Sequence, residues 1–150
     1  MTTTIRDATR DDAETLARFA EAMARETEDK TLDAVIVRAG IRAVLRDATK
    51  GFYLVAEHRD EVVGALMVTT EWSDWRNGTF WWIQSVYVRP EARRQGVYTA
   101  LYTYVRQRAA NREGVCGLRL YVEAGNTDAQ ATYERLGMTP TTYRLYETSL

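Results

Sequence analysis

The sequence is poor in the residues from which several common kinds of site are built. It has one cysteine, one histidine and two prolines among 150 residues. A single cysteine excludes an internal disulfide, and Cys116 lies in an expected strand, where we expect a small core residue and not a reactive thiolate. The histidine, His58, lies in an expected turn, so a histidine-based catalytic triad is not expected.

The chain also lacks long hydrophobic runs and an excess of either charge. No apolar run approaches the roughly 20 residues of a membrane-spanning helix, and the first residues do not resemble a signal peptide. The formal net charge of -1 gives no reason to expect nucleic acid or a membrane as the main partner. With 45% hydrophobic and 27% charged residues, the composition is typical of a soluble globular protein. We therefore expect one domain over residues 1–150, in the cytoplasm.

Two familiar nucleotide-binding motifs are absent, since there is no G-x-G-x-x-G after an early strand and no G-K-(S/T). Instead, a strand, a basic turn and a helix are expected between Trp81 and Asn111, with Arg93 and Arg94 before Gly96 in the turn. The first N–H groups of a helix have no partner within it and carry the positive end of its dipole, so they attract anions. Glycine lets the backbone come close to a bulky phosphate. The alternative is an ordinary connection with two solvated arginines.

The helix after this turn is predicted from apolar residues at helical spacing. They are Val97, Ala100, Leu101, Tyr104, Val105 and Ala109. Asn111 and Gly114 indicate where this helix ends.

Two helices are expected in the first third of the chain, after a short strand at residues 3–9. Thr9 and Asp12 form a capping-box-like start for the first helix, and Thr31 is expected to cap the second. The buried face of the second helix is predicted to consist of Leu32, Val35, Ile36, Ala39, Ala43 and Val44.

The rest of the sheet is predicted from alternating patterns and turn residues. Strands are expected at residues 52–57, 61–70, 115–122 and 141–148, with another strand after the tight reversal at Asn77-Gly78. The last helix is expected to be capped by Asn126 and to end at Gly137. The expected order is therefore strand, two helices, three strands, helix, strand, helix and strand.

All four tryptophans, Trp72, Trp75, Trp81 and Trp82, lie within eleven residues. Such a cluster can close one end of the core or form a dimer contact. It can also form an aromatic wall beside an acceptor site, with Glu71 and Asp74 attracting an ammonium group. Both interpretations stay open.

The basic turn resembles the acetyl-CoA-binding motif of the GCN5-related N-acetyltransferase (GNAT) superfamily. That motif is (Q/R)-x-x-G-x-(G/A) after a strand that ends in a V-x-V-like segment. Residues 93–97, Arg-Arg-Gln-Gly-Val, fit the motif, and residues 85–90 fit the strand end. Tyr98 departs from it, because glycine or alanine is usual there. Residues 126–138 resemble a second family segment, N-x-x-A-x-x-x-Y-(E/K)-x-(L/A)-G-(M/F).

This resemblance implies an α/β (α+β) fold with a mixed, mostly antiparallel sheet flanked by helices, in which strands 4 and 5 splay apart. It implies acetyl-CoA as the acetyl donor, bound in that gap, and no metal. The pantetheine arm would pair with the backbone of the fourth strand, and the pyrophosphate would bind the amides of the turn. By position, the implied coenzyme-binding residues are Val86, Tyr87, Val88, Arg93, Arg94, Gln95, Gly96, Val97, Tyr98 and Asn126.

The implied reaction moves an acetyl group to a primary amine by direct attack in a ternary complex. The amine must be neutral, because an ammonium has no lone pair. The resemblance implies that Tyr133 protonates the coenzyme sulfur. Many relatives have a glutamate in the middle of the fourth strand, where this chain has Gln84, which cannot take a proton at neutral pH. We hypothesise that Glu71 is the base, with Glu26, Glu28 or a water held by backbone carbonyls as alternatives.

The acceptor is expected to be a small or peptidic amine, and a cationic one because of the acidic residues at 26–29, Glu71 and Asp74. The rival hypothesis is a module of the same fold that binds acyl-CoA or another protein without turnover, which the departures at Tyr98 and Gln84 keep open. A nucleic-acid role ranks third because the net charge opposes it. A homodimer through the aromatic hairpin also stays open.

Overall fold

The computed structural model describes residues 1–150, which fall into two compact units, residues 1–120 and residues 121–150. The first unit contains a five-stranded sheet and the helices α1, α2 and α3. The second unit contains the helix α4, Thr127–Arg135.

The sheet of the first unit has its strands side by side in the order β1-β2-β3-β4-β5. The strands are β1 (Thr4–Asp7), β2 (Phe52–His58), β3 (Glu61–Ser73), β4 (Gly78–Val88) and β5 (Val115–Arg119). The first four pair antiparallel with their neighbours, and β5 joins β4 in parallel at the edge. This mixed, mostly antiparallel sheet confirms the predicted fold class.

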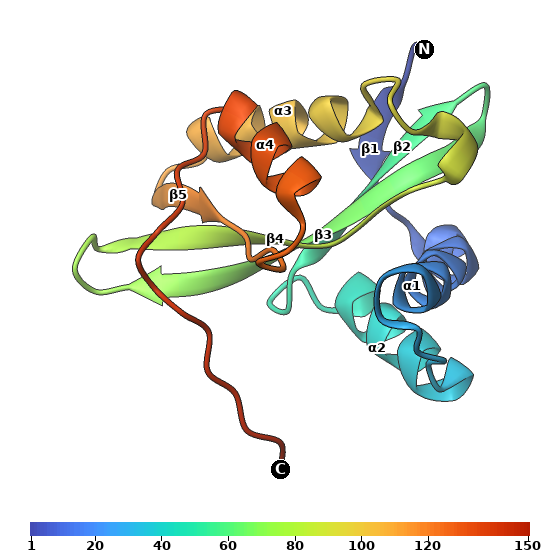
Figure 1. The fold of residues 1–150 in the computed structure, drawn as a ribbon, viewed down its shortest axis with the longest axis horizontal. Helices are drawn as coiled ribbons and strands as arrows, with labels where there is room; N and C mark the ends of the chain where they lie inside the picture. Colours follow the sequence, from blue (N-terminus) through green and yellow to red (C-terminus); the bar gives the residue numbers. More distant parts are fainter. The chain divides into compact units, whose positions relative to one another are not determined.

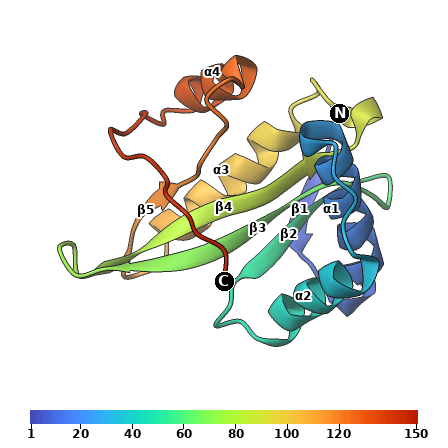
Figure 2. The ribbon, with the colours of Figure 1, turned by 60° about the horizontal axis from the view of Figure 1, so that its bottom comes forward.

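Helices cover both faces of the sheet, as Figures 1 and 2 show. The helices α1 (Ala13–Glu28) and α2 (Ala34–Arg46) lie on one face, and α3 (Val97–Ala110) crosses the other. Short 3-10 helices, η1 (Arg10–Asp12) and η2 (Pro90–Ala92), precede α1 and α3. Neither these helices nor α4 combine the length and the apolar character that a membrane span requires.

The strands divide the core between the two faces because successive side chains of a strand point to opposite sides. The cluster on the side of α1 and α2 contains Leu16, Ala17, Phe19, Ile41, Tyr53, Val55, Ala65 and Tyr87. The strand residues between them point to the side of α3. Leu54, Leu66 and Val68 are completely buried there, as are Leu101 and Val105 of α3.

The capping box predicted at Thr9 and Asp12 starts the 3-10 helix η1, which leads directly into α1. The Thr9 N–H donates to Asp12 Oδ2 at 2.7 Å, and the Asp12 N–H donates to the Thr9 carbonyl at 3.0 Å. Arg6 of β1 donates to both carboxylate oxygens of Asp12, at 2.8 and 3.0 Å. Although Asp12 is only 6% exposed, these hydrogen bonds, chiefly those from Arg6, hold its pKa below the usual value.

The start and the buried face of α2 differ from the prediction. The N-cap is Asp33 and not Thr31, since Asp33 Oδ1 accepts from the N–H groups of Val35 and Ile36 at 2.9 and 3.1 Å. Val35 and Ile36 are 78% and 70% exposed, so the predicted buried face is wrong there. The residues that pack toward the core are Val37, Ile41, Val44 and Leu45. Both sets have helical spacing, and only the packing of α2 on the sheet decides between them.

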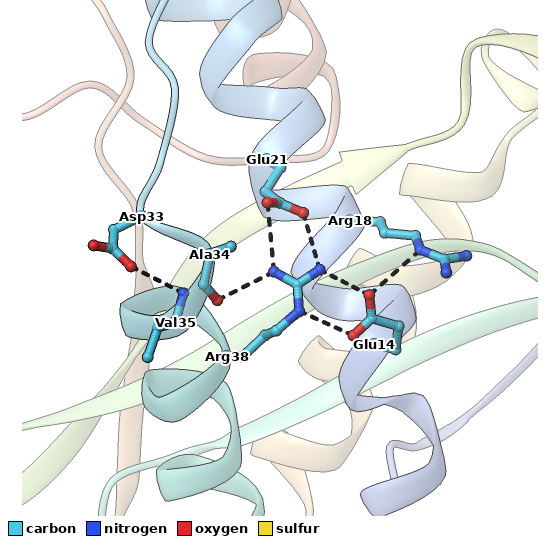
Figure 3. A network of polar contacts seen from close by, with 7 residues as sticks. All are labelled: Glu14, Arg18, Glu21, Asp33, Ala34, Val35 and Arg38. Atoms are coloured by element: carbon cyan, nitrogen blue, oxygen red, sulfur yellow. Dashed lines mark hydrogen bonds and ion pairs between the residues drawn. The ribbon is translucent and has the colours of Figure 1, made fainter.

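Arg38 joins α2 to α1, with its guanidinium between two glutamates of α1 (Figure 3). It donates to Glu14 at 2.7 and 3.0 Å and to Glu21 at 3.3 and 3.4 Å. Its Nη1 also donates to the Ala34 carbonyl at 3.1 Å, within its own helix. A guanidinium that binds a carboxylate through two nitrogens fixes direction as well as distance. Arg38 therefore sets how α2 lies against α1.

The third helix and the edge strand show two smaller differences from the prediction. In α3, Tyr102 is 5% exposed, whereas Tyr104, which was predicted to be buried, is 36% exposed. The face of α3 that packs on the sheet therefore includes Tyr102. Cys116 is exposed and is not a core residue. It lies in β5, the edge strand, which has a neighbour on one side only.

In the second unit, α4 begins and ends as predicted. Asn126 caps it, since Asn126 Oδ1 accepts from the Ala129 N–H at 3.1 Å. The chain leaves the helix through Gly137, whose φ of 96° lies in the left-handed region that glycine adopts without strain.

The closing strand predicted at residues 141–148 is wrong. Residues 138–150 contain no helix or strand. Tyr143 and Leu145, which alternate in the sequence as in a strand, are 76% and 68% exposed. A strand is stabilised by hydrogen bonds to a neighbour and by a buried face, and this segment has neither.

We expect Asp12→Asn to lower the free energy of unfolding by about 2 kcal/mol at pH 7, because it removes the charged partner of Arg6 and weakens the capping box. The folded-state pKa of Asp12 is lowered. Its contribution is therefore present above the unfolded-state pKa of about 3.9 and is lost as the pH falls through the folded-state value.

Urea denaturation of the wild type and the variant between pH 7 and pH 2 measures this effect, and the difference between them should shrink toward acid. Asp11→Asn is the control, since Asp11 is an exposed neighbour of Asp12 and should change nothing. A difference that is constant over this pH range would contradict the role given to Asp12.

Candidate functional site

Strands β4 and β5 part halfway along β4. Their parallel pairing joins residues 79–82 of β4 to β5 and ends at Trp82 and Arg119. There β5 ends, whereas β4 continues to Val88. Residues 83–88 thus have β3 on one side and no strand on the other, which is the predicted splay. The backbone groups on the open side can bind an extended ligand.

The open half of β4 contains a β-bulge at Ser85 and Val86, which sequence reasoning missed. The register with β3 shifts between Ala65 and Met67, so that two residues of β4 face one residue of β3. Ser85 has a φ of 51°, a left-handed conformation that is uncommon for serine. Bulges redirect neighbouring groups and are frequent next to active sites. Because no glycine marks the position, the sequence gives no signal for it.

Beyond the bulge, Val88 directs its backbone groups to the open side of β4. The Arg89 N–H donates to the Val63 carbonyl at 2.9 Å, so the backbone groups of Arg89 face β3. Successive residues of an antiparallel strand direct these groups to alternate sides. Those of Val88 therefore point away from β3, and those of Tyr87 point toward it. Of these two predicted pantetheine-binding residues, Val88 is the better placed.

Arg93 ties the end of β4 to α1. Its Nε donates to the Val88 carbonyl at 2.9 Å, and its Nη2 donates to both carboxylate oxygens of Glu26 at 3.1 Å. Its guanidinium lies 5.4 Å from the centre of the Tyr87 ring. Because Glu26 balances the charge of Arg93, this arginine adds little net positive charge to the turn. Its main effect is to hold the turn in position.

The turn between β4 and α3 has an open space in front of its backbone. Arg94 and Gly96 lie in the left-handed region, at φ of 63° and 82°. A Cβ on Gly96 would meet no atom within 4 Å. The Val97 N–H that follows begins α3 and has no acceptor within the helix. Arg94 is exposed, and Gln95 donates from its side chain to the Glu91 carbonyl at 2.9 Å. This arrangement suits a phosphate group.

Tyr98, the departure from the family pattern, packs along α3. Its ring centre lies 6.3 Å from that of Tyr102, one turn later in the same helix. Tyr98 is half-buried in this position. Apart from Gln95 and Val97, no residue has an atom within 4 Å of the Cβ position of Gly96, so the Tyr98 ring does not reach that position.

Glu71 lies next to the point where β4 and β5 part, and two side chains donate to it. Trp82 Nε1 donates to Glu71 Oε1 at 3.1 Å, and Arg119 Nη1 donates to the same oxygen at 2.8 Å. These hydrogen bonds, first the one from Trp82, hold the pKa of Glu71 below its usual value. A lower pKa makes a carboxylate a weaker base.

The strand register also separates Glu71 from Val88. Glu71 pairs with Phe80, whereas Val88 pairs with Gly64. Gly64 and Glu71 are seven residues apart in β3, which corresponds to roughly 23 Å. A general base must lie within hydrogen-bond reach of the proton, or one water away. The prediction that Glu71 is the base therefore has no support from this geometry if the acetyl group lies at Val88.

Most of the acidic residues that were expected to attract an amine already have basic partners. Glu26, Glu28 and Glu71 pair with Arg93, Lys30 and Arg119, at N–O distances of 3.1, 3.8 and 2.8 Å. Asp29 and Asp74 are exposed. The attraction for a cationic amine is therefore weaker than the sequence predicts. Gln84 is also engaged, because its Nε2 donates to Thr69 Oγ1.

The tryptophans do not form one cluster in the structure. Trp81 is 4% exposed and meets the Phe52 ring edge-on, with ring centres 5.3 Å apart, so it belongs to the core. Trp72 and Trp75 are 64% and 88% exposed at the β3–β4 hairpin, which extends past β5 in Figure 1. Trp72 follows Glu71 in β3 and is still farther from Val88, so it does not line a wall beside that residue.

In the second unit, the proposed acid, Tyr133, lies on α4. Burial raises the pKa of the Tyr133 phenol above its usual value, so the phenol is protonated at neutral pH, as a proton donor must be. The side-chain oxygen of Asn126 is engaged in capping the same helix. The side-chain NH₂ group of Asn126 is a donor of the kind that a coenzyme can use.

The comparison with known families gives one assignment for most of the chain. The model described as "Acetyltransferase (GNAT) family" matches residues 10–138. The chain therefore belongs to the acetyltransferase (GNAT) family. None of the curated proteins compared with it matches.

Solved structures agree with this assignment. A "possible acetyltransferase from Clostridium difficile 630" is 45% identical with a TM-score of 0.92, and the match covers 100% of this chain and 99% of the other. A GCN5-related N-acetyltransferase from Ralstonia eutropha JMP134 is 24% identical with a TM-score of 0.77, covering 98% and 99%. A ribosomal-protein-alanine N-acetyltransferase from Brucella melitensis biovar Abortus 2308 is 17% identical with a TM-score of 0.79, covering 99% of each chain. The last two show similarity of fold alone.

Proposed function

We propose that the protein is an N-acetyltransferase that moves the acetyl group of acetyl-CoA to a primary amine of a small or peptidic substrate, by direct attack in a ternary complex. One observation carries this proposal: the unpaired half of β4 leads into the open turn at Gly96, where α3 begins. An extended acyl-pantetheine arm can pair with the strand, and a diphosphate can bind the turn. Membership of the GNAT family supports the same activity.

The chain's backbone does most of the proposed coenzyme binding. Val86 in the bulge offers backbone groups to the pantetheine arm, and Val88 beyond it offers its N–H, because Arg93 already donates to the Val88 carbonyl. The Tyr87 ring packs beneath Arg93. The amides from Arg94 to Tyr98, which include Gln95, Gly96 and Val97, hold the pyrophosphate. Arg94 adds a positive charge beside them, and the family resemblance assigns a further coenzyme-binding role to Asn126.

The proposed reaction forms a bond between the amine nitrogen and the acetyl carbon and breaks the thioester C–S bond. The acetyl oxygen gains negative charge on the way, and the Val88 N–H, which faces the open side of β4, stabilises that charge. The Tyr133 phenol gives its proton to the departing sulfur. The amine loses one proton to a base, so that a neutral amide and a thiol remain.

For the base we propose Glu26, one of the carboxylates that the sequence leaves open. Glu26 lies at the end of α1 and is joined through Arg93 to the carbonyl of Val88. It is therefore close to the end of β4, whereas Glu71 is not. Both oxygens of Glu26 accept from Arg93, as Glu71 accepts from Arg119, so its position and not a stronger basicity distinguishes it. Each oxygen keeps a lone pair that can take the proton directly or through one water.

The rival hypothesis, a module that binds acyl-CoA without turnover, makes a different prediction about thiol release. Tyr98 packs along α3 and leaves the turn open, which favours coenzyme binding under either hypothesis. A panel of small amines and peptide N-termini, assayed for free thiol released from acetyl-CoA, separates the two. Release with any amine supports the enzyme, and tight binding with no release on the whole panel supports the module.

We expect Gly96→Ala to weaken acetyl-CoA binding by about tenfold or more, because a methyl group enters the space in front of the amides and the left-handed backbone is strained. Gly114→Ala is a matched control. Gly114 has a φ of 86°, and its Cβ would also meet nothing within 4 Å, but it lies past the other end of α3.

Both glycine variants should lose about 1 kcal/mol of stability, since each places an L-residue in the left-handed region. Calorimetric titration with acetyl-CoA then separates strain from binding, and only Gly96→Ala should show a higher Kd. If the two variants bind acetyl-CoA equally well, the turn is not the diphosphate site.

We expect Tyr133→Phe to lower kcat by roughly 10² to 10⁴-fold with the Kd for acetyl-CoA unchanged, because the ring stays and only the proton donor is lost. Because burial raises its pKa, Tyr133 keeps its proton up to its ordinary value of about 10 and beyond. The wild type should therefore lose activity through this group only at more alkaline pH. Tyr143→Phe, at a tyrosine that is 76% exposed, is the control. An unchanged kcat in Tyr133→Phe would exclude the acid role.

The pH dependence of kcat distinguishes the two candidate bases. We expect Glu26→Gln to lower kcat, because an amide cannot accept a proton. In the wild type, kcat should rise with pH as the base loses its proton, and this rise should be absent in Glu26→Gln. Glu71→Gln should leave the shape of the profile unchanged. The reverse result would restore Glu71 as the base and remove Glu26.

A further inference from the structure

The side chains of three neighbouring strands meet on one face of the sheet just before β4 and β5 part. Glu71 of β3 lies opposite Phe80 of β4, and Phe80 lies opposite Gly117 of β5. Arg119 follows two residues after Gly117, so it points to the same face. It is also the last residue of β5 that pairs with β4.

From this position Arg119 reaches back across β4. Its guanidinium lies 3.6 Å from the centre of the Phe80 ring, and its Nη1 donates to Glu71 at 2.8 Å. Trp82 of β4 donates to the same carboxylate oxygen at 3.1 Å. One side chain of β5 is therefore bound to both β4 and β3.

Gly117 provides the space for this contact. A Cβ on Gly117 would lie 2.8 Å from Cε1 of Phe80, closer than real Cβ atoms come to other atoms. The Phe80 ring thus lies over β5 at Gly117, and the Arg119 guanidinium packs on this ring. The Arg119 side chain is 27% exposed, which shields its ion pair and its ring contact partly from water.

We propose that Arg119 is a positioning residue that holds β5 on β4 as far as Trp82 and thereby fixes where the open edge of β4 begins. Without this bridge, the end of β5 separates from β4, and the edge that receives the pantetheine arm loses its defined start. The expected effect on acetyl-CoA binding rests on the proposed function, because the coenzyme must bind at the open edge of β4 if displacing that edge is to weaken binding. Its structural part, the holding of β5, does not depend on the coenzyme.

The experiment compares Arg119→Met with Arg76→Met. Arg76 also lies over the Phe80 ring, at 4.9 Å, but it comes from the hairpin and does not link β5 to β3. We expect Arg119→Met to raise the Kd and the KM for acetyl-CoA by about three- to tenfold, the range of one partly exposed ion pair and one cation–π contact. The kcat and its pH profile should stay the same. Arg76→Met should change none of these values.

Three further variants test how Arg119 acts, two of them through Glu71. Glu71→Gln should also raise the Kd for acetyl-CoA. The double variant Glu71→Gln/Arg119→Met should have a Kd no higher than that of the single variant that binds acetyl-CoA less tightly, because both substitutions remove the same ion pair. Arg119→Lys keeps the charge but loses the planar contact with the ring, so it should restore part of the affinity. Additive effects in the double variant would overturn the proposal.

Hydrogen exchange of the protein without coenzyme tests the structural part directly. The amides of residues 117–119 should exchange faster in Arg119→Met than in the wild type, and those of α1 should not change. Equal protection of β5, or equal Kd values for Arg119→Met and Arg76→Met, would overturn the proposal. If the wild type itself binds no acetyl-CoA, the proposed function fails, while the exchange result still decides whether Arg119 holds β5.

Discussion

A strand edge without a partner is the constraint on which the rest of this structure depends. Backbone N–H and C=O groups require hydrogen-bond partners, and residues 83–88 of β4 have a neighbouring strand on one side alone. The surrounding features are arranged around that edge. The bulge at Ser85 redirects it, Arg93 fixes its far end to α1, and α3 begins where it stops. The positive end of α3 thus follows the open strand in the chain, after η2 and the turn at Gly96.

Ion pairs near this edge connect helices and strands of the first unit, and they leave few arginines and carboxylates there without a partner of opposite charge. Arg93 and Arg119 each bind a carboxylate and also lie over an aromatic ring, so both connect elements that are far apart in the sequence. Arg94 forms no ion pair and is exposed at the turn. Electrostatic attraction for an anion at the turn therefore comes from the α3 dipole and from Arg94. Ion pairs likewise balance the negative charges of Glu26, Glu28 and Glu71.

The sequence predicts those features that are encoded within a short stretch. The capping box at Thr9, the glycine turn at Gly96 and the Asn126 cap each depend on residues close together, and the structure has all three. Features that depend on distant contacts were not predicted. The choice between two apolar stripes of α2, the bulge at Ser85 and the distance from Glu71 to Val88 follow from packing and strand register, which no local pattern specifies. The closing strand failed for the same reason, since alternation in residues 141–148 cannot supply a neighbouring strand.

Recognition through backbone groups depends little on the side chains, because amides at a strand edge and at a helix start are present whatever the side chains are. The fold itself also tolerates extensive sequence change, since solved structures at 24% and 17% identity share it. Proton transfer has the opposite requirement, because it needs a particular side chain at a particular distance. With Gln84 in the middle of β4, a base has to come from another element, whereas backbone binding of a coenzyme does not depend on the side chain of residue 84. In the proposed function that element is the end of α1, where Arg93 joins Glu26 to the end of β4.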